Sequence, residues 1–406
     1  MAEKKTDNKY FPALYQRDFR LLWIGQVISF TGTWMHSTAQ GWLVYSLTKS
    51  PLYLGLVSAS SSIPVMLLSL LGGVVADRFR KRNLLMLTQA LQIIPALAIG
   101  VLSYLGIITV WEVIIFVSML GFINAFDVPA RQSFFAEIVE KGNLMNAIAL
   151  NSAAFNGARI SGPVIAGLTI AYIGLPACFF INALSFLAVV FALYKMESRG
   201  TLPVSTKKSL KGELVEGMKF VKGEPYILAT LSLVGMFTLF AIPFITLLPV
   251  FAVAILKSGP KGFGFLVGSA GVGAFAGAIA LAYKGSYNSK TNVMRVNAVL
   301  FPAALLAFSQ SRDYYLSALC LAVAGWALIS FLALANSTIQ LRTSDALRGR
   351  VMSVYTLVFL GLAPLGNLLL GSAAEFAGTP QALGASSVLC IFLAIILGRR
   401  LKVEEK

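Results

Sequence analysis

The stretch Gly72 to Asn83, GGVVADRFRKRN, decides the fold of this 406-residue chain. It carries one acid and four bases, and it joins two long apolar runs at 52–75 and 84–104. A run of about 20 apolar residues spans a bilayer as a helix, so both flanks predict transmembrane helices. Because short loops rich in Lys and Arg resist translocation, we expect this loop on the cytoplasmic side of the membrane.

The composition predicts an all-α membrane protein that crosses the bilayer many times. Hydrophobic residues make up 57% of the chain, charged residues make up 12%, and the mean hydropathy is +0.78. The net charge of +16 reflects topology, because most lysines and arginines fall on the side of the 72–83 loop; the exceptions are Lys49, Lys257, Lys261, Arg312 and the interior Arg159. Anionic membrane lipids are the expected partners of these bases, and nucleic acid is excluded.

Residues suited to catalysis or metal binding are scarce. The chain has one histidine, and each of its three cysteines lies inside an apolar run. It contains neither the G-x-x-x-x-G-K-[ST] pattern of nucleotide-driven pumps nor the G-x-S-x-G pattern of a nucleophile elbow. We therefore expect no enzyme activity, no cofactor and no metal.

Hydropathy divides the chain into two bundles of six transmembrane helices each. We expect a cytoplasmic segment at 1–20, a first bundle at 21–195, a linker at 196–224, a second bundle at 225–399 and a cytoplasmic tail at 400–406. Within the linker, residues 213–222 can form an amphipathic helix at the membrane surface. An even number of spans returns the C-terminus to the cytoplasm.

A weak internal sequence repeat predicts that the two bundles are related. Gln132, with an acid five residues later, precedes a helix that carries Pro163, and Gln340, again with an acid five residues later, precedes a helix that carries Pro364. The two offsets are 208 and 201 residues. Such spacing is typical of parallel repeats about an axis along the membrane normal.

The first span carries a polar stripe. Ser29, Thr33, His36 and Gln40 recur at helical spacing, and in hydrocarbon such a face must look into the protein or a wet cavity. We expect Trp34, His36 and Gln40 to line a substrate cavity. The alternative is hydrogen bonding between helices together with an aromatic belt at the membrane surface.

Asp127 and Arg131 form the strongest chemical feature inside a span. They lie four residues apart on one helical face, with Pro129 between them, so they can pair. An ionisable residue at membrane depth indicates function, and a carboxyl group in a low dielectric can exchange a proton near neutral pH. Asp127 is therefore the candidate proton carrier. The alternative is that both side chains lie at the cytoplasmic end of the helix and reach water.

Arg159 is the most deeply placed charge in the sequence. An unpaired cation there would cost about 3 kcal/mol on insertion scales. We therefore expect either an acidic side chain or an anionic substrate as its partner. Asp127 is the nearest candidate acid, although it lies several residues away in estimated depth.

The 72–83 loop resembles the signature loop between helices 2 and 3 of major facilitator superfamily transporters. The resemblance rests on Gly73, Asp77, Arg78, Lys81 and Arg82, whereas Arg80 stands where the family usually has Gly. A glycine lets a neighbouring backbone approach, and an aspartate four residues later can accept hydrogen bonds from another helix N-terminus or from an arginine. Such a contact would latch the cytoplasmic side shut. The alternative is a plain basic stop signal.

Gly162 and Pro163, followed by Gly167, resemble the antiporter motif on helix 5 of drug and proton antiporters in the same superfamily. The match is partial, because Ala158 and Ala166 stand where the motif has Gly. Close packing of helices through small residues explains the same letters.

Two longer stretches, 17–57 and 127–163, look like the bacterial transmembrane secretion effector group of this superfamily, which includes the enterobactin exporter. The resemblance implies two six-helix bundles around a central cavity, alternating access, and export coupled to proton entry. Members of this group and its neighbours handle siderophores, drugs and other metabolites, so the resemblance does not identify the substrate.

The function expected from these features is secondary active export of a small molecule in exchange for protons. The protein would lie in the cytoplasmic membrane of a bacterium, as a monomer with both termini cytoplasmic. Arg131 and Arg159 would tune Asp127 or hold an anionic substrate, while Asp77 and Arg78 would stabilise the state closed to the cytoplasm. A proton-independent facilitator or importer would share every span. A non-transporting scaffold or a receptor would need soluble segments longer than the linker.

Overall fold

The computed structural model describes residues 11–198, 210–283 and 290–401. Parts of the expected N-terminal segment, linker and tail, at 1–10, 199–209 and 402–406, lie outside the described residues. The first half contains α1 (Arg17–Thr48), α2 (Pro51–Arg78), α3 (Lys81–Tyr104), α4 (Val110–Ile138), α5 (Leu144–Tyr172) and α6 (Leu175–Lys195). The second half contains α8 (Pro225–Phe240), α9 (Phe244–Val250), α10 (Gly259–Tyr283), α11 (Lys290–Gln310), α12 (Tyr314–Leu341), α13 (Asp345–Gly361), α14 (Ala363–Ala377) and α15 (Thr379–Arg400), and α7 (Leu210–Gly223) precedes it.

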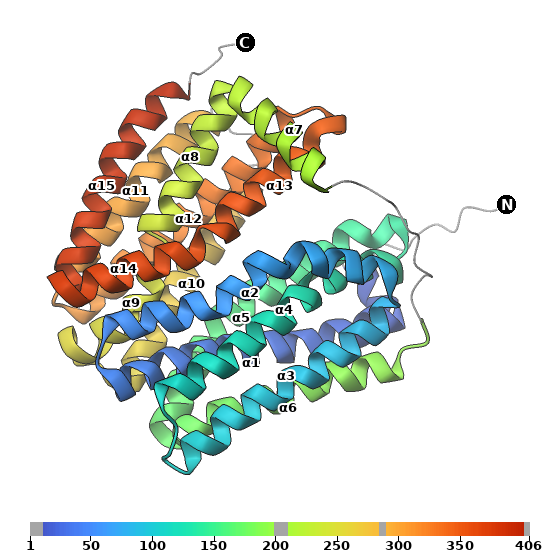
Figure 1. Cartoon of the computed structure of the whole chain (residues 1–406), viewed down its shortest axis with the longest axis horizontal. Helices are drawn as coiled ribbons and strands as arrows, with labels where there is room; N and C mark the ends of the chain where they lie inside the picture. Colours follow the sequence, from blue (N-terminus) through green and yellow to red (C-terminus); the bar gives the residue numbers. More distant parts are fainter. Residues whose placement is uncertain (1–10, 199–209, 284–289, 402–406) are drawn as a thin grey trace.

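The described helices form two bundles of six membrane spans each, which confirms the predicted fold class (Figure 1). Ten segments are long and apolar enough to cross a membrane, and α1 and α5 complete the set. The pairs α8–α9 and α13–α14 each make one interrupted span. Pro243 and Pro364 stand at these breaks, because proline lacks an N–H donor and its ring clashes with the preceding turn.

The two bundles meet along α2–α14 and α5–α10 at two matching crossings. A Cβ atom at Gly55 would lie 2.4 Å from the carbonyl oxygen of Asn367, and one at Gly264 would lie 2.4 Å from that of Pro163. Each glycine follows a proline by four residues, Pro51 in α2 and Pro260 in α10, at an offset of 209 residues. The crossings are therefore a repeat of the two halves that our sequence comparison missed.

Both crossings lie on one side of the molecule. We call this side the sealed side. The opposite side carries the 79–80 loop and α7, and we call it the basic side. On the sealed side, the Glu375 carboxylate accepts hydrogen bonds from Ser50 Oγ at 2.6 Å and from the Leu52 N–H at 3.3 Å. Lys261 Nζ donates to the Tyr172 hydroxyl at 2.6 Å. The bundles converge there and diverge toward the basic side, where both chain ends leave (Figure 1).

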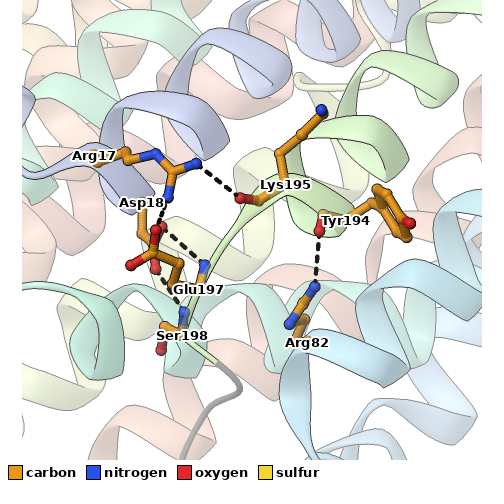
Figure 2. Close-up of polar contacts among 7 residues, drawn as sticks. All are labelled: Arg17, Asp18, Arg82, Tyr194, Lys195, Glu197 and Ser198. Atoms are coloured by element: carbon orange, nitrogen blue, oxygen red, sulfur yellow. Dashed lines mark hydrogen bonds and ion pairs between the residues drawn. The ribbon is translucent and has the colours of Figure 1, made fainter.

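On the basic side, the end of α6 is fixed by residues from the starts of α1 and α3 (Figure 2). Arg82 donates to the carbonyl oxygens of Leu193 and Tyr194 at 2.7 and 3.0 Å. Asp18 accepts from the backbone N–H groups of Glu197 and Ser198 at 3.2 and 2.7 Å. A cation at a helix C-terminus satisfies free carbonyl groups and complements the helix dipole.

The second half has the same kind of contact, an arginine bound to the end of a helix. Arg295 at the start of α11 donates to the Gly398 carbonyl oxygen at the end of α15 at 2.8 Å. The linker helix α7 also packs against the second half rather than lying alone. Glu216 pairs with Arg350 of α13, and a Cβ atom at Gly217 would lie 2.5 Å from the Arg350 carbonyl oxygen.

Candidate functional site

Asp127 lies in α4 and is fully buried. One carboxylate oxygen accepts hydrogen bonds from Thr88 Oγ1 at 2.7 Å and Gln89 Nε2 at 2.8 Å, and the other oxygen pairs with Arg131. Three donors from two helices therefore satisfy both oxygens of this buried carboxylate. The alternative in which Asp127 reaches bulk water is wrong, because none of its surface is exposed.

The α3 partners of Asp127 belong to this candidate site, and our sequence reasoning missed them. Thr88, Gln89 and Gln92 are all buried on the face of α3 that meets α4. The signal was present, since the three polar residues fall within five positions of an otherwise apolar span. Within the described part of the chain, Gln89 Oε1 and Gln92 Nε2 are buried and have no hydrogen-bond partner.

A cavity of about 490 Å³ lies inside the first bundle, against this cluster. Its wall includes Thr33 of α1, Gln92 of α3, Asn124 and Arg131 of α4, and Asn151 and Phe155 of α5. The Arg131 guanidinium also lies 5.3 Å from the ring centre of Phe30, which lines the cavity too. Arg131 therefore connects the buried carboxylate to the cavity.

A smaller cavity, of about 130 Å³, lies between the two bundles near the sealed side. Trp34 and Gln40 line it from α1, together with Ser58 of α2 and Thr246 of α9. The two α1 residues thus face a cavity between the halves.

The prediction that His36 lines a cavity is wrong. Its side chain is only 4% exposed and packs edge-on against Phe179 of α6, with ring centres 4.9 Å apart. His36 is two positions, or about 200° of helical rotation, from Trp34, so the two side chains leave α1 on opposite faces. His36 belongs to the packing of α1 on α6.

Arg159 does not pair with Asp127. Its guanidinium lies 5.8 Å from the ring centre of Trp34, and among the described residues no carboxylate lies within ion-pair distance of it. The acid that our sequence reasoning named as its nearest candidate is held by Arg131 instead.

The signature loop divides its residues between two roles. Lys81 pairs with Glu137 of α4 at 2.5 Å, and Arg82 holds the end of α6, so both fix α3 inside the first bundle. The side chains of Asp77 and Arg78 are exposed at the end of α2 and form no hydrogen bond or ion pair with the described residues. In this conformation they are free to bind a partner.

The close backbone approach lies at Gly72 rather than at Gly73, which corrects the prediction. A Cβ atom at Gly72 would lie 1.9 Å from the Ala125 carbonyl oxygen of α4, whereas one at Gly73 would meet nothing within 4 Å. One residue is 100° of helical rotation, so adjacent glycines face different surroundings.

The α5 motif residues serve two helix contacts. A Cβ atom at Gly162 would lie 2.5 Å from Trp34 Cβ of α1, and one at Gly167 would lie 2.7 Å from the Pro260 carbonyl oxygen of α10. Pro163 is buried between them and presents its own carbonyl oxygen to Gly264. Close packing through small residues describes this geometry.

Comparisons with known proteins agree with this architecture. The profile of a family described as transmembrane secretion effector matches residues 9–406. The staphyloferrin A transporter of Staphylococcus aureus is 25% identical over 92% of this chain and 95% of its own length. The multidrug efflux pump Tap of Mycolicibacterium fortuitum is 24% identical over 87% and 88%, and the enterobactin exporter EntS of Shigella boydii is 22% identical over 89% and 83%.

Solved structures share the fold at lower identity. The nucleoside transporter NupG superposes with a TM-score of 0.72 at 15% identity, covering 95% of this chain and 100% of that chain. A bacterial homologue of the human lysosomal transporter Spinster, in an inward-facing conformation, gives 0.74 at 13% identity and covers 98% of both chains. The chain therefore belongs to the transmembrane secretion effector family of major facilitator transporters, and it is a multi-pass membrane transporter rather than an enzyme.

Proposed function

We propose that this transporter exports a small molecule across the cytoplasmic membrane of a bacterium in exchange for protons. The observation that carries the proposal is Asp127, a fully buried carboxylate held by three donors and linked through Arg131 to a cavity of about 490 Å³. The names of the relatives, a staphyloferrin A transporter, a multidrug efflux pump and an enterobactin exporter, support a siderophore or a drug as the substrate class.

The chemistry of the site suits a proton carrier. Protonation of Asp127 neutralises the carboxylate and removes its ion pair with Arg131, which changes how α4 is held to α3. In the cycle proposed here, the protonated chain returns to the cytoplasm-facing conformation without substrate. The proton then leaves to the cytoplasm by way of the cavity that Arg131 lines.

The basic side is the cytoplasmic side in this proposal, because lysine-rich and arginine-rich segments stay in the cytoplasm. Both termini then lie in the cytoplasm, and the basic residues face anionic lipid headgroups. A latch that acts only in the cytoplasm-closed state must be released in the opposite state. Asp77 and Arg78 are indeed free in this conformation, which is sealed on the other side.

The test is proton movement in vesicles that contain the purified transporter, recorded while catecholate siderophores, staphyloferrin A or lipophilic cationic drugs are added. We expect substrate-dependent proton flux that falls to background in Asp127→Asn, because an amide cannot carry the proton. Glu140→Gln, an exposed acid outside the site, is the matched control and should behave as wild type.

Two outcomes would contradict the proposal. Full proton flux in Asp127→Asn would remove the carrier role from this residue. Substrate movement with no proton response in the wild-type protein would favour a proton-independent facilitator, with Asp127 and Arg131 stabilising the bundle.

A further inference from the structure

Arg159 is a cation without a protein counter-charge in the part of the chain that the structure describes. Asp127, the fully buried acid, is engaged by Arg131, Thr88 and Gln89. The other described acids lie in terminal turns, in connections or in the linker helix α7. A charged side chain in a span is costly unless it is paired or faces water, and Arg159 is partly exposed, so an anion from outside the protein can reach it and supply the missing counter-charge.

The position of Arg159 marks the point where α5 and α10 separate. From the sealed side inward, α10 meets α5 at Gly264 and then at Gly268, and a Cβ atom at Gly271 would lie 3.1 Å from the Arg159 carbonyl oxygen. Beyond this contact toward the basic side, a Cβ atom at Gly157 would meet nothing within 4 Å. Arg159 therefore lies at the end of the α5–α10 contact that faces the basic side.

The surroundings of Arg159 add an aromatic wall. Its guanidinium lies over Trp34, the Trp34 ring lies edge-on to Phe155 at 5.8 Å, and Phe155 lies edge-on to Phe30 at 5.5 Å. A guanidinium presents parallel N–H donors that match a carboxylate, and aromatic faces suit a flat or apolar body beside it. Arg131 is less available for this task, because it already pairs with Asp127.

We infer that Arg159, supported by Trp34, binds a carboxylate of the exported molecule, whose apolar part packs on Trp34 and Phe155. This assignment rests on the export function proposed above and names the chemical class of its substrate. It also separates the two arginines: Arg131 serves the proton-carrying carboxylate, and Arg159 serves the substrate anion.

The experiment is equilibrium binding to the purified full-length protein in neutral detergent, without a pH gradient. Salicylate and citrate are the probes, and salicylamide and triethyl citrate are their uncharged counterparts. The readout is tryptophan fluorescence, with Trp34→Phe identifying the part of the change that comes from the residue beneath Arg159. We expect the carboxylates to bind and the uncharged analogues to bind much more weakly.

Variants of Arg159 then test the residue itself. Arg159→Gln should raise the Kd of both carboxylates about tenfold or more, because a charge-assisted hydrogen bond is lost. Arg159→Lys should have an intermediate effect, because it keeps the charge but loses the paired donors. Arg400→Gln, which removes an exposed cation at the end of α15, should leave the Kd unchanged.

The results separate this inference from the proposed function. Equal affinity in Arg159→Gln and wild type, or no carboxylate binding to wild type, would overturn the inference. Asp127→Asn should still bind the carboxylates while losing proton flux, so a failure of proton coupling alone would leave the inference intact. Should Arg159→Gln not fold, Arg159→Lys and the rise in the wild-type Tm with carboxylate decide the question.

Discussion

At the scale of single residues, the site depends on how one buried charge is satisfied. Asp127 has a local partner, Arg131, one helical turn away, and two distant partners, Thr88 and Gln89, on the neighbouring helix. The local pair follows from sequence spacing alone. The distant partners required the rotation of α3 to be known. A buried charge with donors from two helices also ties those helices together.

Gln89→Leu tests that tie. It removes a hydrogen bond to the ionised carboxylate, and we expect a loss of about 1.5–3 kcal/mol in unfolding free energy, visible as a lower apparent Tm in detergent. Gln92→Leu is the matched control on the same helix, because Gln92 Nε2 has no hydrogen-bond partner among the described residues and its loss should cost little. Equal effects of the two substitutions would show that the Gln89 bond to Asp127 contributes nothing measurable.

At the scale of helices, the seal between the bundles depends on glycine at two equivalent crossings. The Gly55 and Gly264 backbones each lie so close to a carbonyl oxygen of the facing helix that a Cβ atom would be 2.4 Å from it. Backbone atoms cannot move aside as a flexible side chain can, so a larger residue would force the crossing apart.

Gly264→Leu should therefore disfavour the conformation sealed on this side and close the cavity toward the basic side. The measurement is the labelling rate of a reporter cysteine at Ser152→Cys, in the wall of the larger cavity, by a thiol probe added to the basic side. The background is low, because the three native cysteines are buried. We expect slower labelling in Gly264→Leu.

Gly349→Leu is the control for Gly264→Leu, since a Cβ atom at Gly349 would meet nothing within 4 Å. It should label at the wild-type rate. An unchanged rate in Gly264→Leu as well would mean that the α5–α10 crossing does not limit the conformational change.

At the scale of the whole molecule, the same two spans carry an acid at each side of the transporter, and only the acid on the sealed side is engaged in this conformation. On the sealed side, Glu375 near the end of α14 accepts hydrogen bonds at the start of α2. On the basic side, Asp77 near the end of α2 is free in this conformation. An acid at a helix N-terminus is stabilised by the free N–H groups and the helix dipole, so Asp77 suits the start of α13 when the bundles close there.

Asp77→Ala should remove that latch and favour the conformation open to the basic side. We expect faster labelling of the Ser152→Cys reporter than in the wild-type background, the opposite change from Gly264→Leu. Glu140→Ala, another exposed acid on the basic side, should leave the rate unaltered. A wild-type labelling rate in Asp77→Ala would show that Asp77 does not act as a latch.

The sequence by itself determined the features that depend on composition and local spacing. Long apolar runs determined the spans, and the four-residue spacing of Asp127 and Arg131 made their pairing available. These features follow from the cost of placing polar groups or backbone groups without hydrogen bonds in hydrocarbon. Each segment meets this cost independently of the others.

Only the tertiary structure decided which face of each helix meets which neighbour. It turned His36 toward α6, assigned the close approach to Gly72 rather than Gly73, brought Thr88 and Gln89 to Asp127, and left Arg159 without an acidic partner among the described residues. The reason is that lipid tails are as apolar as leucine, so hydropathy inserts a helix without fixing its rotation. Rotation is set by close packing and hydrogen bonds between helices that are far apart in the sequence.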